Sequence, residues 1–530
     1  MPRGACRSVL GPVCQFVEPR GAMHDDSSEM MRRLVLPGCT ALTLLLASAP
    51  AFAQECPHIR PTDPNPAFIG YEGAETATWD TPEGRVRVWY ATEGEHLPPD
   101  ESTLEPGVPD AAVRAGRAAE DALTKYDALG FAAPPSDADL PACASNGGDG
   151  RIDVYLLNFG GGIDGASWED QCTPGEGGFA SVCIGHIMVE NDFVGFSAYD
   201  DLEEGMKTVI PHEMFHLVQY AYDDDAETWI DESSAVWAAD VVYPELGELE
   251  RTIGNYMKEP EEPLDSYSYS GGAWPLYLAT RFGPLVIEDL YVAFGETNAS
   301  AYGAIDSALT DKHDTSLAEA LLLFGAWNAA TGTRAGEGEG GYPGAAGLAM
   351  VTPRNLPSDV GASVSDATKN AAFHYFQTLG APPRQLSLET GDGKNLGMIV
   401  PLEGGKARLD QVQALPAVAE GDFIVVVAGG PLGGGPYTVN AVAPPPDPSG
   451  GAGGAGGAGG AGGAGGADGS GATAPGPAPG HNGGLASEGG GCSTGRPGAP
   501  ADAAPALLLL VAALVRRRAE QRCAPRKLRG

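Results

Sequence analysis

The chain has 530 residues, of which 32 are Lys or Arg and 70 are Asp or Glu, so its formal net charge is −38. This balance argues against nucleic-acid binding, which needs clustered basic side chains, and against docking on anionic lipids by charge alone. A hydrophobic content of 43% fits a folded protein, and the length allows two or three domains. The 76 Gly and 44 Pro residues indicate that part of the chain is not globular.

A secretory signal peptide is predicted at residues 30–53. Arg32 and Arg33 precede an apolar run at 34–49, and Ala51-Phe52-Ala53 then provides the small residues of a cleavage site. The apolar run is too short for a membrane helix, so we expect export. Residues 1–29 resemble no targeting element, which indicates a misassigned start codon.

Four cysteines lie between the two ends of the chain, and in an exported domain they predict two disulfides with three possible pairings. Cys172 and Cys183 enclose a Gly-rich turn and are the expected pair, which leaves Cys56 with Cys143.

The middle of the chain predicts an α+β fold with a first domain at 54–340 and a small β-sandwich at 365–444. In the first domain, alternating or continuous apolar residues indicate strands, and apolar residues at helical spacing indicate helices. After it, short β-like runs are separated by turns that contain Gly and Pro. Strands are expected at 85–90, 151–158, 182–190 and within 373–442, and helices at 111–129 and over most of 202–327.

One motif carries the chemistry, His212-Glu213-Met214-Phe215-His216. On a helix, positions i and i+4 lie one turn apart on one face, so both imidazoles can bind one ion. The flanking residues are apolar, so the helix is buried, where His and Glu are costly without a partner and Zn²⁺ satisfies them. We therefore expect His212 and His216 to be zinc ligands and Glu213 to be the general base toward a zinc-activated water. Pro211 marks either the first turn of this helix or a kink in a longer one.

A second helix is expected to supply the third ligand. Its predicted N-cap is Thr228, and Glu232 shares a face with small residues that allow close approach to the first helix. Glu232 is the expected ligand, and Asp231 is expected to orient a ligand imidazole. Tyr267 and Tyr269 are candidate donors to an oxyanion, with simple packing as the alternative.

The segment from 151 to 244 resembles secreted bacterial zinc metalloproteases of the zincin class, and is gluzincin-like in its third ligand. The resemblance extends over residues 80–330, whereas Gln219 and Tyr222 depart from the metzincin pattern. It implies a zincin fold, a mixed sheet over the active-site helix, in which an edge strand at 181–190 pairs with extended peptide substrate. The residues that carry it are Ile152-Asp153-Val154-Tyr155, His212-Glu213-x-x-His216, Gln219 and Trp229-x-x-Glu232-Ser233-x-Ala235-x-Trp237.

The C-terminal region predicts a flexible tether and a sorting signal. Residues 445–490 include a Gly-Gly-Ala repeat that cannot bury a core. Beyond them, in 491–530, Gly491-Cys492 precedes an apolar segment at 503–515 and three arginines. This tail resembles the MYXO-CTERM sorting signal of myxobacteria, which implies processing at Cys492 and anchoring at the outer membrane or cell surface.

The leading hypothesis is thus a surface-anchored zinc endopeptidase acting on proteins or peptides. The alternatives are a catalytically silent surface adhesion or scaffold protein, and a zinc hydrolase acting on a non-peptide bond. Glu213 favours an enzyme, since a structural zinc site needs a fourth closing ligand and no general base. The acidic run Asp223-Asp224-Asp225 is compatible with Ca²⁺, although a solvated loop is the simpler interpretation. No pattern indicates an oligomer.

Overall fold

A computed structural model of the chain describes residues 60–64, 66–138, 149–175, 181–223, 226–297, 299–336, 340–391 and 394–445. The expected signal peptide, the second disulfide, the tether beyond residue 445 and the sorting signal with Cys492 lie outside these ranges. Within them, no helix combines the length and the apolar character needed to cross a bilayer.

The N-terminal part of the described chain forms a five-stranded mixed sheet in the order β1-β2-β3-β5-β4. The central strands β2, β3 and β5 are parallel to one another, whereas β1 and β4 are antiparallel to their neighbours. β3 is buried along almost its whole length, as expected for a parallel strand covered on both faces. The bounds are β1 Thr76–Asp80, β2 Val86–Ala91, β3 Ile152–Leu157, β4 Gly165–Thr173 and β5 Val182–Glu190.

The edge of this sheet is not where the sequence placed it. We expected residues 181–190 to form the edge, but β5 lies between β3 and β4, and β4 is the outer strand. The strand β4 was not predicted, because it contains polar residues, among them Glu169, Asp170 and Gln171, where a predicted strand would show alternating apolar residues. Such composition is common in edge strands, which must avoid pairing with other chains.

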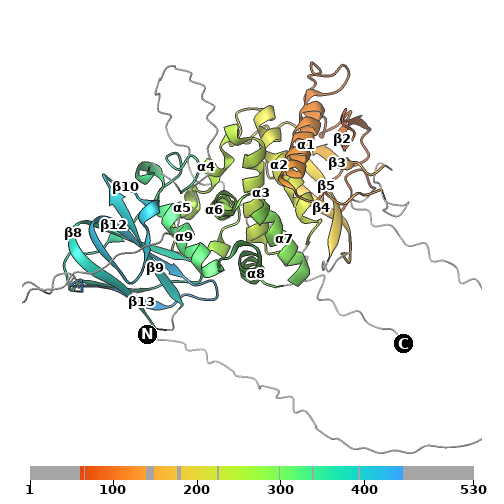
Figure 1. Cartoon of the computed structure of the whole chain (residues 1–530). Helices are drawn as coiled ribbons and strands as arrows, with labels where there is room; N and C mark the ends of the chain where they lie inside the picture. Colours follow the sequence, from red (N-terminus) through yellow and green to blue (C-terminus); the bar gives the residue numbers. More distant parts are fainter. Residues whose placement is uncertain are drawn as a thin grey trace, which may run out of the picture. The chain divides into compact units, whose positions relative to one another are not determined.

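Two long helices lie beside this sheet (Figure 1), α1 at Asp110–Leu129 and α2 at Leu202–Gln219. Phe215 of α2 makes edge-to-face contacts with Tyr126 of α1 and with Trp237 of α3 (Thr228–Val242), so these helices share one apolar core. α2 also packs on β4 and β5. The remaining α-helices of the described region are α3 Thr228–Val242, α4 Glu248–Thr252, α5 Gly254–Lys258, α6 Ala273–Phe282, α7 Leu285–Thr297, α8 Ala301–His313 and α9 Leu317–Ala329.

A buried ion cluster ties the segment before β1 to the sheet. The Arg60 guanidinium, 2% exposed, donates to Asp137 at 2.8 Å, to Asp170 at 2.6 Å and to Asp153. Asp170 also lies 3.0 Å from Nδ1 of the fully buried His186. Each buried charge thus has a partner, as burial requires.

The β-rich region that follows the helices confirms the α+β class. Its strands are hydrogen-bonded into one eight-stranded sheet, whereas we expected the two sheets of a sandwich. α9 packs on β9 and β12, so one face of the sheet shares the core of the helical region, and the other face forms a core of its own. The strands are β6 Arg354–Asn355, β7 Ser363–Ala367, β8 Phe373–Thr390, β9 Asn395–Glu403, β10 Lys406–Ala407, β11 Gln413–Ala414, β12 Ala417–Gly429 and β13 Pro436–Val442.

Candidate metal centre

Helix α2 presents both histidines of the motif on one face. The helix begins well before Pro211, at Leu202, where the side chain of Asp201 accepts a hydrogen bond from the Glu204 amide and caps the first turn. Pro211 therefore lies inside the helix, which resolves the alternative that the sequence left open. The Nε2 atoms of His212 and His216 lie 3.2 Å apart.

Helix α3 brings Glu232 to the same point. Its Oε2 lies 3.2 Å from Nε2 of His212 and 3.7 Å from Nε2 of His216. The helix begins at Thr228, but the N-cap position belongs to Glu227 and not to Thr228 as expected. The carboxylate of Glu227 makes no capping bond, because it accepts hydrogen bonds from the Trp229 indole and the Ala301 amide.

The spacing of the three atoms fits a tetrahedral zinc site. Two ligand atoms about 2.0–2.1 Å from zinc at a tetrahedral angle are about 3.3 Å apart. The observed separations of 3.2, 3.2 and 3.7 Å are close to that value. Two imidazole nitrogens and a carboxylate oxygen are also a donor set that zinc accepts, with a fourth position left for a small molecule.

The electrostatics of the three side chains favour a bound cation. Although burial opposes ionisation, the hydrogen bond with His212 and the ion pair with His216 hold the pKa of Glu232 well below its ordinary value. Burial likewise disfavours a charged His216, yet the ion pair with the nearby Glu232 carboxylate raises the pKa of His216 to about 10. The same convergence that holds a proton this tightly is suited to a divalent cation, because both are stabilised by the carboxylate.

Glu213 lies beside the triad and is 8% exposed. Burial, opposed by the nearby histidines and reinforced by Glu232 and Asp164, raises its pKa above the ordinary value. The start of β4 makes room for it: a Cβ on Gly165 would lie 3.3 Å from Oε1 of Glu213 and 2.3 Å from a methyl carbon of Val209. Only glycine therefore allows the edge strand to approach α2 this closely.

The two tyrosines expected near the site are separated by the fold. The ring of Tyr269 stacks on His212 with 5.5 Å between centroids, and the charges of Glu232 and Glu213 act on its hydroxyl. The hydroxyl of Tyr267 instead donates to the Glu259 carbonyl at 2.6 Å, and its ring contacts Tyr256. Tyr269 is held in place because Gly272, one turn on, lets this segment pack against Val236 of α3, where a Cβ would lie 3.3 Å from its methyl carbon.

The partner of the His216 imidazole is a residue for which no role was expected. Nδ1 of His216 lies 2.6 Å from Oε1 of Gln219, whereas Asp231 was the residue that we expected to orient a ligand imidazole. Asp231 stands one step behind: its carbonyl accepts a hydrogen bond from Gln219, and its carboxyl accepts one from Tyr291. Burial raises the pKa of Asp231 to about 7. The i, i+3 spacing of His216 and Gln219 was a usable signal, but Tyr291 is too distant in sequence to have given one.

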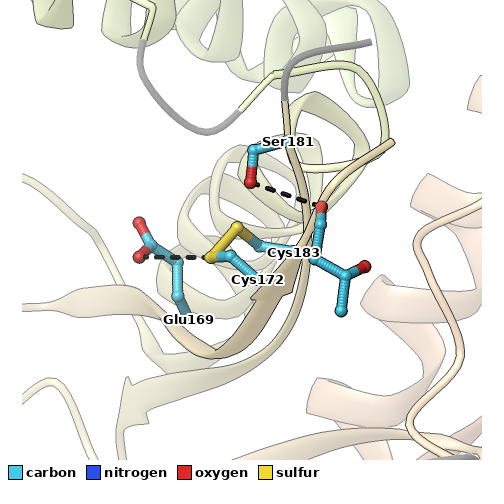
Figure 2. The surroundings of a disulfide bond; sticks show 5 residues. Glu169, Cys172, Ser181 and Cys183 are labelled. Atoms are coloured by element: carbon cyan, nitrogen blue, oxygen red, sulfur yellow. Dashed lines mark hydrogen bonds between the residues drawn. A yellow bond between two sulfur atoms is a disulfide. The ribbon is translucent and has the colours of Figure 1, made fainter. Parts of the chain in front are cut away.

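The expected Cys172–Cys183 disulfide is present, and it joins β4 to β5 at directly paired positions. Figure 2 shows Glu169 with its carboxylate toward Cys172, and Ser181 close by, just before β5. Glu169, Cys172 and Cys183 lie close enough to suggest a metal site, but sulfurs joined in a disulfide are not thiolate ligands. In the described part of the chain, His212, His216 and Glu232 are the other such group.

Comparisons with known proteins give no assignment. No protein-family model matches the chain, and no curated protein is significantly similar to it. Of the proposed calcium ligands, Asp224 and Asp225 lie outside the described residues.

Proposed function

We propose that the chain is an exported zinc metallopeptidase that holds its metal with His212, His216 and Glu232. The observation that carries this proposal is the convergence of two Nε2 atoms and one carboxylate oxygen at 3.2–3.7 Å, with Glu213 buried beside them. We further propose that the mixed sheet with α2 against it is a zincin-type fold, which is the fold that the resemblance implies. Anchoring at the cell surface remains a proposal from the sequence of the tail.

The chain's own residues have distinct roles in this reaction. Bound zinc supplies Lewis acidity, which activates water and polarises the scissile carbonyl. Glu213 accepts the proton of the attacking water at its carboxylate and returns it to the nitrogen of the leaving amine. Tyr269, stacked on His212, has a phenolic hydroxyl that is a donor at neutral pH, and it is the candidate for stabilising the developing oxyanion.

The edge strand β4 favours a peptide as substrate. Among the described strands β4 pairs only with β5, so its other edge offers backbone donors and acceptors to an extended chain. The strand begins at Gly165, beside Glu213, so a peptide added there passes the general base.

The test is Glu213→Gln in the full chain, with zinc content and peptide hydrolysis measured in parallel. We expect about one zinc per chain in both proteins and a loss of hydrolysis in the variant of at least about 100-fold, since general-base catalysis contributes on this order. Equal hydrolysis by both proteins contradicts the proposed mechanism. Zinc without hydrolysis of any peptide in the parent favours a silent scaffold or a non-peptide substrate.

A further inference from the structure

The His216 side of the site is built around one buried amide. Gln219 is the last residue of α2 and is 2% exposed. Its Oε1 faces Nδ1 of His216 at 2.6 Å, while its Nε2 faces the Asp231 carbonyl oxygen at 2.9 Å. The amide thus lies directly between a proposed ligand on one helix and the backbone of the next.

The Asp231 carbonyl determines which way this amide points. A backbone carbonyl only accepts hydrogen bonds, so the group that faces it at 2.9 Å must be the NH₂ of Gln219. The oxygen of the amide must then face His216, and since this oxygen only accepts, Nδ1 of the ring must carry the hydrogen. A ring with its hydrogen on Nδ1 offers the lone pair of Nε2 to the point where His212 and Glu232 converge.

A third helix contacts the Gln219 amide and fixes its orientation. The hydroxyl of Tyr291, on α7, lies 2.8 Å from Nε2 of Gln219, 2.7 Å from the Ser234 hydroxyl and 3.1 Å from the Asp231 carboxyl. Tyr291 is 1% exposed. The partners of the Tyr291 hydroxyl lie on α2 and α3. Rotation of the Gln219 amide would therefore break hydrogen bonds that join these helices.

We propose that Gln219 is a positioning residue that selects the metal-binding tautomer of His216 and fixes the ring, with the Asp231 carbonyl and Tyr291 holding the amide. The inference rests on the proposed zinc site and adds the device that orients one of its ligands. His212 has a different support: in the described region no hydrogen bond reaches its Nδ1, and its ring is held by stacking on Tyr269. Loss of the amide should therefore loosen one specific ligand and leave the other in place.

The test measures zinc affinity of the full chain by competition with a chromophoric chelator, so that it does not depend on turnover. Gln219→Leu keeps the volume and removes both ends of the amide, and we expect zinc to bind about 10- to 100-fold more weakly, as is typical when the outer hydrogen bond of a ligand is lost. Gln219→Glu should also weaken binding, because its carboxylate faces the Asp231 carbonyl. In Tyr291→Phe the Gln219 amide keeps its hydrogen bond to the Asp231 carbonyl, so the loss of zinc affinity should be several-fold smaller than in Gln219→Leu.

The matched control is Asn328→Leu. Asn328 is a fully buried amide that bonds the hydroxyls of Tyr256 and Tyr342, away from the triad. This variant should lose stability, as a Gln219 variant does, but keep parental zinc affinity. If both Leu variants change affinity equally, or if Gln219→Leu binds zinc as the parent does, the inference is wrong even though the zinc site stands. A parent that binds no zinc contradicts both proposals.

A second readout reports the tautomer directly. In the zinc-loaded chain labelled with ¹⁵N-histidine, proton–nitrogen correlations should show a slowly exchanging hydrogen on Nδ1 of His216. The absence of this signal in His216→Gln distinguishes it from the signals of other buried rings such as His186, whose Nδ1 faces Asp170. Tyr291→Phe should retain this signal, and Gln219→Leu should lose it. A His216 ring protonated on Nε2 in the parent would overturn the proposal.

Discussion

The Nε2 atoms of His212 and His216 face each other at 3.2 Å, and no hydrogen lies between them when both neutral rings carry their hydrogen on Nδ1. Two lone pairs at this distance repel unless a cation or a proton lies between them and the carboxylate of Glu232. In the proposed zinc site, the carboxylate of Glu232, from a different helix, balances part of the charge of that cation.

Removal of Glu232, the proposed third ligand, should release the proposed zinc ion. We expect the zinc affinity of Glu232→Ala to fall by more than the roughly 10- to 100-fold that follows loss of an outer hydrogen bond. Two imidazoles alone leave the charge of the ion unmatched. Zinc per chain is measured by elemental mass spectrometry after dialysis. Asp231→Asn is the control, because Asp231 directs its carboxyl to Tyr291, and it should retain zinc. The reverse pattern would make Asp231 the third ligand.

Filling the space at the start of β4 should impair catalysis more than metal binding. A methyl group on Gly165 meets Val209 at 2.3 Å and Glu213 at 3.2 Å, so Gly165→Ala must move the edge strand or the carboxylate. We expect a stability loss of about 1–3 kcal/mol and a clear fall in kcat/KM, with zinc content unchanged because the ligands lie on α2 and α3. Gly162→Ala, whose nearest neighbour is 3.7 Å away, should behave like the parent. Unchanged kcat/KM in Gly165→Ala would show that the close approach has no role in catalysis.

The disulfide should stabilise the hairpin that carries the edge strand. Cys172 and Cys183 are 11 residues apart, and closing a loop of this size stabilises a fold by about 2–3 kcal/mol. Urea unfolding of the Cys172→Ala/Cys183→Ala protein should show this loss under oxidising conditions. Any further loss on adding reductant reports a different disulfide, such as the one expected between Cys56 and Cys143. A double variant as stable as the parent would mean that the strands are held by packing alone.

The β-rich region should lose stability in acid through His374. Burial, with the charge of Arg354, lowers the pKa of this ring to about 4, and the Tyr437 hydroxyl lies 2.6 Å from its Nδ1. The pKa of His374 in the folded protein lies below the unfolded value of about 6.5. Its contribution to the free energy of unfolding is therefore complete above pH 6.5 and is lost as the pH falls toward 4. It amounts to about 2–3 kcal/mol.

The measurement is urea unfolding at pH 7 and pH 4, with a chelator present so that metal release does not contribute. His374→Gln keeps an acceptor for Tyr437 and should reduce the difference between the two pH values by that amount. If parent and variant lose equal stability, the acid sensitivity originates elsewhere, for example in other buried groups.

Much of the secondary structure could be predicted because it depends on local pattern. The strand expected at residues 182–190 agrees with β5, and the helix expected at 111–129 agrees with α1 to within one residue. The spacing of His212 and His216 predicted that both lie on one face of the helix, because side chains four residues apart on a helix lie about one turn apart. Glu232 could be named because a second buried helix with a carboxylate among small residues followed closely.

The tertiary structure decided what depends on neighbours distant in sequence. The pairing of β4 outside β5 is set by the hairpin and by Gly165 against α2, and the polar sequence of β4 carries no signal of its own. Tyr267 and Tyr269 are two residues apart, yet only the packing of their segment on α3 determines which of them meets His212. Gln219 was visible in the sequence, but its function required the Asp231 carbonyl, because a backbone group whose direction is set by the fold decides which end of the amide the imidazole meets.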